Sequence, residues 1–438
     1  DGVDPARMKH KENGNQADNL FYQMRQDGDN KWLFICHVDK PRNEAIAWNE
    51  RWDIKIKGEY QAVCYDTMDG KIYPVKVAIK DGNTIIHHIA SLHDSLLLKL
   101  LAIENSKKAD SVNAVDNVAK EEVFKIPQNQ KNLPEPFQYR LEEHNSLLLD
   151  MAQYAFDEEE WQEREELLRI DNLFREKLHY PLRMEALAQP WTEKDEQKSE
   201  HVLKLRFHIY SEIEMDEVEL AMEHPETAEI CWNGKAVEYV DSGFYVDESI
   251  HTCKLKKLQK GENVLLVKIP FGRKTNVEWM YLLGEFGVKT IGKYGIITNL
   301  PTRLCYGDIT TQNLAFYGGS LEYKSKVRTE SGIMNLEVSH YKGALLEVFL
   351  DGVNKGPLFM APYRKNLGKV EKGEHEITIK VYGNRSNTFG VVHNADRTES
   401  WYGPNLWRTT GNKWSYEYQL EQMGVLATPV YWIEEETD

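Results

Sequence analysis

Short runs in the first third of the chain have the hydrophobic spacing of β-strands. Residues 32–36, with the sequence WLFIC, form a continuous apolar run of the kind that a buried strand makes. Residues 53–57 alternate polar and apolar side chains, and residues 95–100 form a further run rich in leucine. This spacing predicts strands whose alternate side chains enter a common core.

Turn dipeptides separate these runs. Asp69-Gly70 and Asp81-Gly82 each lie between strand-like segments, and Asp-Gly is a preferred pair in tight β-hairpins. Because no alternation of strands with helices accompanies them, we expect an antiparallel sheet. The pattern predicts a β-sandwich over residues 21–125, preceded by a disordered or extended leader over residues 1–20.

Residues 126–200 have a different pattern, which predicts a linker followed by an acidic helical connector. Asp157 and Glu160 have the spacing of a capping box, and Pro181 is expected to end the helix. The segment from 141 to 200 holds 17 acidic and 7 basic residues, which we expect to face solvent. The apolar residues of the helix fall on one face: Leu167, Ile170, Phe174 and Leu178.

The remaining half of the chain repeats itself. Lys260-Gly261-Glu262 and the strand-like residues after it recur as Lys372-Gly373-Glu374, at an offset of 112. Asn233-Gly234 recurs as Asp351-Gly352, at an offset of 118. Because both pairs keep their order, the repeat indicates two copies of one supersecondary arrangement.

A third match pairs residues 281–288 with residues 418–425, at an offset of 137. The three matches together predict two β-sandwiches, over residues 201–297 and 298–438. The offset increases by 25 residues, from 112 to 137, so the later copy contains about 25 residues that the earlier copy lacks. We expect this insertion in a loop between about Gly383 and Lys413, since strand pairing excludes it elsewhere.

The expected loop combines aromatic side chains with His, Asn and Arg. Sugars present apolar C–H faces that pack on aromatic rings and hydroxyls that bond to polar side chains, so this mixture is typical of carbohydrate sites. The candidate carbohydrate-binding residues are His393, Asn394, Trp401, Tyr402, Asn405, Trp407 and Arg408.

Other interpretations compete for these aromatic residues. Trp401, Tyr402 and Trp407 follow no alternating pattern, so ligand contact, packing at a domain interface and packing within the loop all stay open. A second aromatic group does alternate with polar residues, which predicts a strand with one face in the core: Trp414, Tyr416, Tyr418 and Leu420.

Composition excludes several classes of function. The formal net charge of -16 argues against nonspecific binding of nucleic acid or anionic membranes, and no run reaches the length of a membrane span. Five widely spaced cysteines predict neither a disulfide framework nor a structural zinc site. We expect no metal site or cofactor. Structural calcium is compatible with a jelly roll, but no ligand spacing demands it.

Two further groups of residues give only weak support to a metal site or a catalytic site. His87 and His88 are neighbours on an expected strand and point to opposite faces, which argues against a shared metal. The Asn-Glu pairs at 43–44 and 49–50 lack the strand–helix scaffold on which paired glycosidase carboxylates usually lie. We therefore predict no catalytic residue.

Several segments resemble parts of large bacterial glycoside hydrolases, in the family 106-like α-L-rhamnosidase and family 2-like groups. Residues 25–35 look like the segment after the catalytic barrel, and residues 65–70 and 93–98 resemble the sandwich that follows it. Residues 232–235, 261–263 and 281–287 look like the galactose-binding-like jelly roll of that group. Residues 401–404, 407–411 and 416–420 are similar to its C-terminal module.

The resemblance implies a mainly β protein of three sandwich modules, the last two of them galactose-binding-like jelly rolls. It implies an accessory C-terminal region of a glycosidase, which stabilises the catalytic barrel of the same polypeptide and contacts carbohydrate. The barrel itself is expected before Asp1, so no catalytic residue is carried over. A self-sufficient carbohydrate-binding protein and a structural or adhesive surface protein are the alternatives. We expect a bacterial protein, cytoplasmic or secreted, with the cytoplasmic location favoured.

Overall fold

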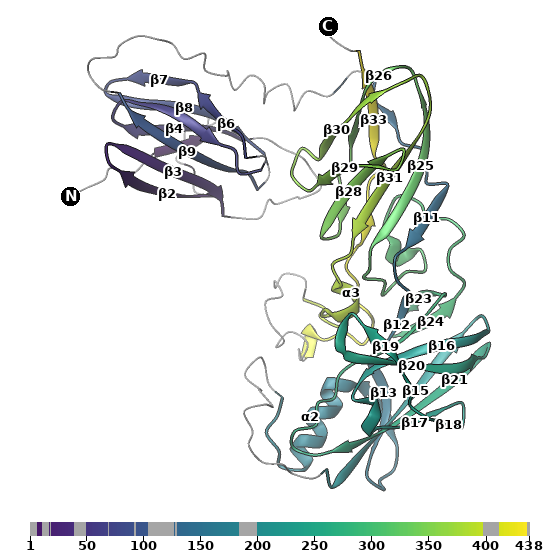
Figure 1. Ribbon diagram of the computed structural model, residues 1–438. Coiled ribbons are helices and arrows are strands. Elements are labelled where there is room, and N and C mark those ends of the chain that lie inside the picture. Colours follow the sequence, from purple (N-terminus) through teal and green to yellow (C-terminus); the bar gives the residue numbers. More distant parts are fainter. Residues whose placement is uncertain are drawn as a thin grey trace.

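The computed structural model is dominated by antiparallel sheets, which confirms the prediction of a mainly β protein built from sandwich modules (Figure 1). It describes residues 7–10, 17, 19–38, 50–68, 70–91, 93–103, 127, 129–183, 199–396 and 411–435. Three separate hydrophobic cores lie within these residues, one for each module. No helix among the described residues is long and apolar enough to cross a membrane.

The first module is a sandwich of two sheets, with the orders β1-β4-β8-β7 and β2-β3-β9-β5-β6. Alternation in the sequence explains its core, because Leu33, Ile54 and Leu98 are fully buried while their neighbours along each strand face outward. Asp81 and Gly82 both have positive φ, as the tight turn between β7 and β8 requires. The strands are β1 Arg7–His10, β2 Leu20–Asp27, β3 Asn30–His37, β4 Glu50–Lys57, β5 Tyr60–Tyr65, β6 Ile72–Val75, β7 Val77–Lys80, β8 Asn83–Ala90 and β9 Ser95–Ala102.

The second module packs a sheet of order β12-β22-β16-β20-β19 against one of order β14-β13-β15-β21-β17-β18. Helix α2 covers one end of this sandwich, and the β23–β24 hairpin joins the second sheet through β15. The elements are β12 Asn145–Leu149, β13 Met151–Phe156, β14 Gln162–Glu166, α2 Leu167–Lys177, β15 His201–Ser211, β16 Met215–Glu223, β17 Glu229–Trp232, β18 Lys235–Val237, β19 Asp241–Tyr245, β20 Asp247–Leu258, β21 Gly261–Phe271, β22 Met280–Gly284, β23 Gly287–Ile291 and β24 Tyr294–Thr298.

The third module has sheets of order β10-β33-β26-β30 and β11-β25-β31-β28-β29, with a small β27–β32 pair beside them. Its strands are β10 Lys131–Asn132, β11 Gln138–Leu141, β25 Leu321–Thr329, β26 Gly332–Glu337, β27 Tyr341–Lys342, β28 Leu345–Leu350, β29 Val353–Leu358, β30 Arg364–Val370, β31 Gly373–Tyr382, β32 Gly424–Val425 and β33 Val430–Glu434. The short helix α3, Ser386–Phe389, follows β31.

Strand order confirms the repeat. The run β15-β21-β17-β18 in the second module corresponds to β25-β31-β28-β29 in the third, and β12-β22-β16-β20 corresponds to β10-β33-β26-β30. The two predicted turns are equivalent as well, because Asn233-Gly234 and Asp351-Gly352 both have positive φ and close the hairpins β17–β18 and β28–β29.

The third sequence match is wrong. The counterpart of β22 is β33, whereas residues 418–420 form no strand and pack against the core of the second module. Strand β33 begins 150 residues after β22, so the insertion is larger than the match suggested. We call residues 383–429 the inserted segment. The alternation from Trp414 to Leu420 therefore does not mark a strand: Tyr418 and Leu420 pack on the core of the second module, Arg169 lies over the Trp414 ring, and Tyr416 is 43% exposed.

Within the described residues of 126–200, where a linker and a helical connector are expected, the five strands β10 to β14 accompany helix α2. Strands β10 and β11 complete the third module, and β12 to β14 complete the second. Asp157 does not cap a helix: it adopts positive φ in a turn, where its carboxylate accepts the backbone N–H of Val202 at 2.7 Å. Helix α2 begins later, at Leu167, with Glu166 as its N-cap. Within the expected leader, β1 pairs with β4.

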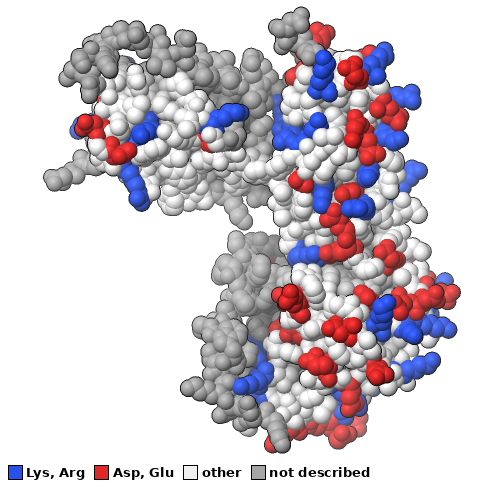
Figure 2. Space-filling view, in the orientation of Figure 1, with Lys and Arg blue, Asp and Glu red and all other residues white. Residues whose placement is uncertain are grey.

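Acidic and basic side chains are interspersed over the face of the second and third modules that Figure 2 shows. The acidic residues of 141–200 belong largely to the folded second module, where several pair with bases, such as Glu159 with Lys177 and Glu165 with Arg169. The charge of this segment is thus distributed over a module surface, as expected for a solvated face.

Removing the ring of Phe174 is expected to destabilise the second module. This fully buried side chain on α2 stacks on Phe156 at 4.1 Å between ring centroids and contacts Phe271 at 4.5 Å. Phe174→Ala should lower the free energy of unfolding by about 3–5 kcal/mol, because it leaves a cavity. Urea denaturation measures this change. Leu173→Ala, on the exposed side of the same helix, is the control and should change little.

Candidate functional site

Two of the seven predicted carbohydrate-binding residues lie within the described part of the chain. His393 is 3% exposed and Asn394 is 9% exposed, and both side chains bond to protein. The other five predicted residues lie outside the described residues and stay a prediction: Trp401, Tyr402, Asn405, Trp407 and Arg408.

His393 links the inserted segment to the second module through hydrogen bonds. Its Nε2 lies 2.7 Å from Oδ2 of Asp150, which is fully buried between β12 and β13, and its Nδ1 lies 2.8 Å from the carbonyl oxygen of Ser415. A carbonyl and a carboxylate both accept, so both ring nitrogens carry protons and the ring is an imidazolium. The Tyr418 hydroxyl donates to Oδ1 of the same carboxylate at 2.8 Å.

The pKa of His393 reflects this arrangement. Burial lowers the pKa, but the hydrogen bond and negative charge of Asp150 outweigh it, so the pKa of His393 lies above its usual value. The rings of Trp414 and Tyr418 lie beside the imidazolium, with centroids 4.8 and 5.1 Å away. The pair is therefore a buried ion pair enclosed by aromatic rings.

Glu166 is a second fully buried carboxyl group near this pair. It accepts the backbone N–H groups of Leu168 and Arg169 and the indole N–H of Trp279, the last at 2.6 Å. Burial raises its pKa to about 7, although these hydrogen bonds act in the opposite direction. Glu166 thus fixes both the start of α2 and the orientation of the Trp279 ring.

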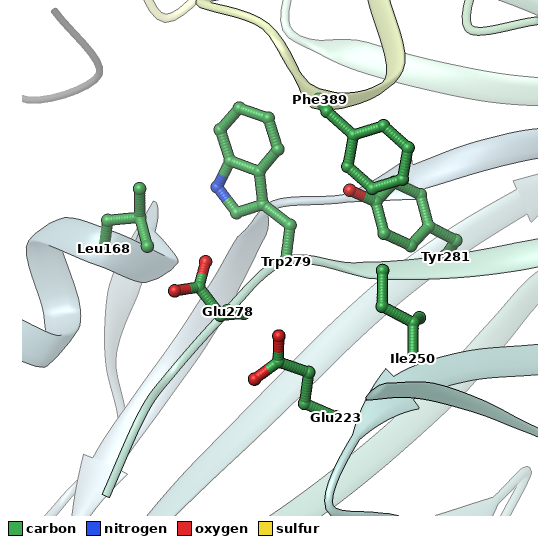
Figure 3. Close-up of a pocket in the computed structure, with 7 residues that line it drawn as sticks. All are labelled: Leu168, Glu223, Ile250, Glu278, Trp279, Tyr281 and Phe389. Atoms are coloured by element: carbon green, nitrogen blue, oxygen red, sulfur yellow. The ribbon is translucent and has the colours of Figure 1, made fainter. Parts of the chain in front are cut away.

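Trp279 in turn forms a wall of a cavity of about 120 Å³. Figure 3 shows the rings of Trp279, Tyr281 and Phe389 along one side and the carboxylates of Glu223 and Glu278 along the other. Leu168 and Ile250 complete the lining. We call this cavity the aromatic pocket. It offers apolar ring faces beside hydrogen-bond acceptors.

One wall of the aromatic pocket comes from the inserted segment. Phe389 ends α3, and its ring centroid lies 5.2 Å from that of Tyr281 on β22. The Tyr281 hydroxyl donates to the carbonyl oxygen of Thr388 at 3.2 Å, and the Thr388 hydroxyl donates to that of Phe316 at 2.9 Å. The pocket is therefore complete only when the inserted segment is docked on the second module.

The loop between β21 and β22 carries another wall and is held by buried cations. Arg175 on α2 is 2% exposed, pairs with Asp171 at 2.9 Å, and donates to the carbonyl oxygens of Arg273 and Thr275. Arg183 also donates to the Thr275 carbonyl, at 3.1 Å. These bonds use charged donors on backbone acceptors, so they hold the loop in one conformation.

Sequence reasoning missed the aromatic pocket because its residues are scattered. They come from β16, α2, β20, β22 and α3, and only Glu278, Trp279 and Tyr281 are close in sequence. The one local signal is a tryptophan beside a glutamate just before a buried strand. No pattern in the sequence joins this segment to Phe389, more than a hundred residues later.

Metal binding gains no support. His87 is exposed and bonds to Asp53, whereas His88 is 4% exposed and bonds to Asp94, so the two rings lie on opposite faces of β8 as expected. In the described ranges, no group of three or more His, Cys, Asp or Glu side chains is placed to hold a metal ion. All five cysteines lie outside disulfide bonds.

No family model and no curated protein matches the sequence. Among solved structures, the chain is similar to a rhamnosidase from Novosphingobium sp. PP1Y, at 10% identity and a TM-score of 0.37, over 97% of this chain and 24% of that one. An α-L-rhamnosidase from Streptomyces avermitilis complexed with L-rhamnose gives 10% identity and a TM-score of 0.25, over 97% and 38%.

A GH2 β-galacturonidase from Eisenbergiella tayi gives 10% identity and a TM-score of 0.19, over 56% of this chain and 37% of that one. The chain thus spans between about a quarter and two fifths of the length of these proteins. At these scores the likeness concerns the β-rich fold alone.

Stability should fall as the pH rises. Folding raises the pKa of His393. The contribution of this residue to the free energy of unfolding is therefore complete below the pKa of the unfolded state and is lost as the pH rises through the pKa of the folded state. The pKa of Glu166 is also raised, from 4.5 to about 7, so ionisation of this group opposes folding over that range. Both groups act in the same direction, and the melting temperature should decrease from pH 5 to above pH 7.

Two variants separate these contributions. Thermal melts over a pH series measure both effects. Glu166→Gln should make the decrease in melting temperature smaller between about pH 5 and 7, and His393→Gln should make it smaller at higher pH. His87→Gln is the control, because that ring is 64% exposed in the first module. An unchanged pH profile in both test variants would show that the buried groups are not the cause.

Proposed function

We propose that this chain is an accessory, carbohydrate-binding region of a bacterial glycoside hydrolase. The observation that carries the proposal is the aromatic pocket, where Trp279, Tyr281 and Phe389 face the carboxylates of Glu223 and Glu278. Sugar C–H faces pack on such rings, and carboxylates accept hydrogen bonds from sugar hydroxyls. A concave site with aromatic walls and few polar groups is the usual form of a small-ligand site.

The accessory part of the proposal is supported by the first module. Its outer sheet face bears apolar side chains that the core does not use: Phe21 is 66% exposed and Phe34 is 36% exposed, on paired strands. Apolar side chains gathered on a sheet face favour contact with another domain. We propose that this partner is the catalytic barrel of the same polypeptide, as the sequence resemblance implies.

Catalysis by this chain alone is not part of the proposal. Asp150 and Glu166, the carboxyl groups with the most unusual surroundings, are fully buried and bonded to protein, so they do not reach a substrate. The pocket carboxylates of Glu223 and Glu278 serve as hydrogen-bond acceptors. Hydrolysis of aryl glycosides by the purified chain, abolished by Glu278→Gln, would overturn the accessory role.

Binding should depend on the ring contributed by the inserted segment. Phe389→Ala is expected to weaken sugar affinity about twofold to twelvefold, because an aromatic contact contributes roughly 0.5–1.5 kcal/mol beyond its buried area. Titration calorimetry with L-rhamnose, D-galactose and D-galacturonate measures this change. Phe359→Ala, at an exposed phenylalanine of the third module outside the pocket, is the matched control. Equal affinities in both variants, or no binding by the parent chain, would contradict the proposal.

A further inference from the structure

A second, larger cavity adjoins the aromatic pocket. Its volume is about 420 Å³, more than three times that of the pocket, and Glu223 and Glu278 line both. We call this cavity the polar groove. Because Glu223 and Glu278 are common to both linings, the pocket and the groove lie side by side on the second module, with these two carboxylates between them.

The groove differs from the pocket in chemistry. Its polar wall includes Thr227, Lys274 and Asn276, and its apolar wall includes Ile269 and Pro270. Phe, Tyr and Trp are absent from the described lining, whose aromatic ring is the imidazole of His224, so a ligand here is held mainly by hydrogen bonds and aliphatic contact. The Lys274 ammonium makes no ion pair or hydrogen bond with the described residues and is available to a ligand.

The same loop shapes both cavities. Lys274 and Asn276 line the groove, and Trp279 lines the pocket, all within the β21–β22 loop that Arg175 and Arg183 hold. The Asn276 amide donates to Glu223 at 3.1 Å, which fixes this carboxylate where the cavities meet. A surface held in this way loses little conformational entropy when a ligand binds.

We propose that the ligand of this surface is an oligosaccharide, with one sugar unit in the aromatic pocket and the next in the polar groove. This inference rests on the proposed function and specifies the length of the ligand. The pocket unit stacks on the rings of Trp279, Tyr281 and Phe389. The groove unit donates hydroxyl hydrogens to the shared carboxylates and accepts from the Lys274 ammonium.

Titration calorimetry on the full chain tests the proposal with two matched series. One series is galactose, galactobiose and galactotriose, and the other is galacturonate with its di- and trimer. In the series that binds, the disaccharide should bind at least fivefold more tightly than the monosaccharide, and the third unit should add less. Lys274→Ala together with Thr227→Ala should abolish this gain and leave monosaccharide affinity within twofold.

The outcomes separate the two claims. Lys235→Ala, at an exposed lysine of β18 outside both cavities, is the control and should keep the gain. Equal affinity for monosaccharide and disaccharide would overturn the groove as a second subsite and leave the pocket intact. A double variant that loses monosaccharide affinity to the same extent would also overturn it. Absence of binding by every sugar would overturn the proposed function and this inference together.

Discussion

The buried ion pair of His393 and Asp150 is the contact on which the arrangement of the last two modules depends. It joins the inserted segment of the third module to the link between β12 and β13 in the second. Burying two charges is costly unless each finds a partner, and here the carboxylate also accepts from Tyr418 while the imidazolium also donates to Ser415. These bonds provide much of the specificity with which the described residues of the inserted segment dock on the second module.

The same region aligns the aromatic pocket through a second buried carboxyl group. Glu166 caps α2 and accepts from Trp279, so one side chain relates the helix to the ring that lines the pocket. Leu167, the first residue of α2, donates its backbone N–H to the Asp150 carbonyl oxygen at 2.9 Å. The start of α2, the ion pair and the pocket wall are therefore parts of one hydrogen-bonded unit.

Local patterns in the sequence predicted local structure well. The Asp-Gly and Asn-Gly turns were recognisable because few residue types adopt the positive φ that these turns require. The alternation in β4 and β9 was recognisable because each strand buries one face and exposes the other. The repeat was recognisable because its turns and long strands keep their order. These features depend on neighbours in sequence.

Predictions that required distant contacts were incomplete. The alternation from Trp414 to Leu420 resembles a strand, yet these residues form none, and Tyr418 and Leu420 pack on another module. Strands β12 to β14 fall within the expected helical connector, because their pairing with β15 and β22 is not visible in the local sequence. The aromatic pocket combines residues from five elements, and no periodicity relates them.

The origin of Phe389 has a consequence for how this protein is divided. A domain boundary drawn between residues 297 and 298 separates the second and third modules by sequence, but it also separates the second module from Phe389, Val392 and Tyr418, which pack on its core. An excised second module would expose that apolar surface to water and lack one wall of its pocket. The smallest unit that retains the pocket therefore contains both the second and the third module.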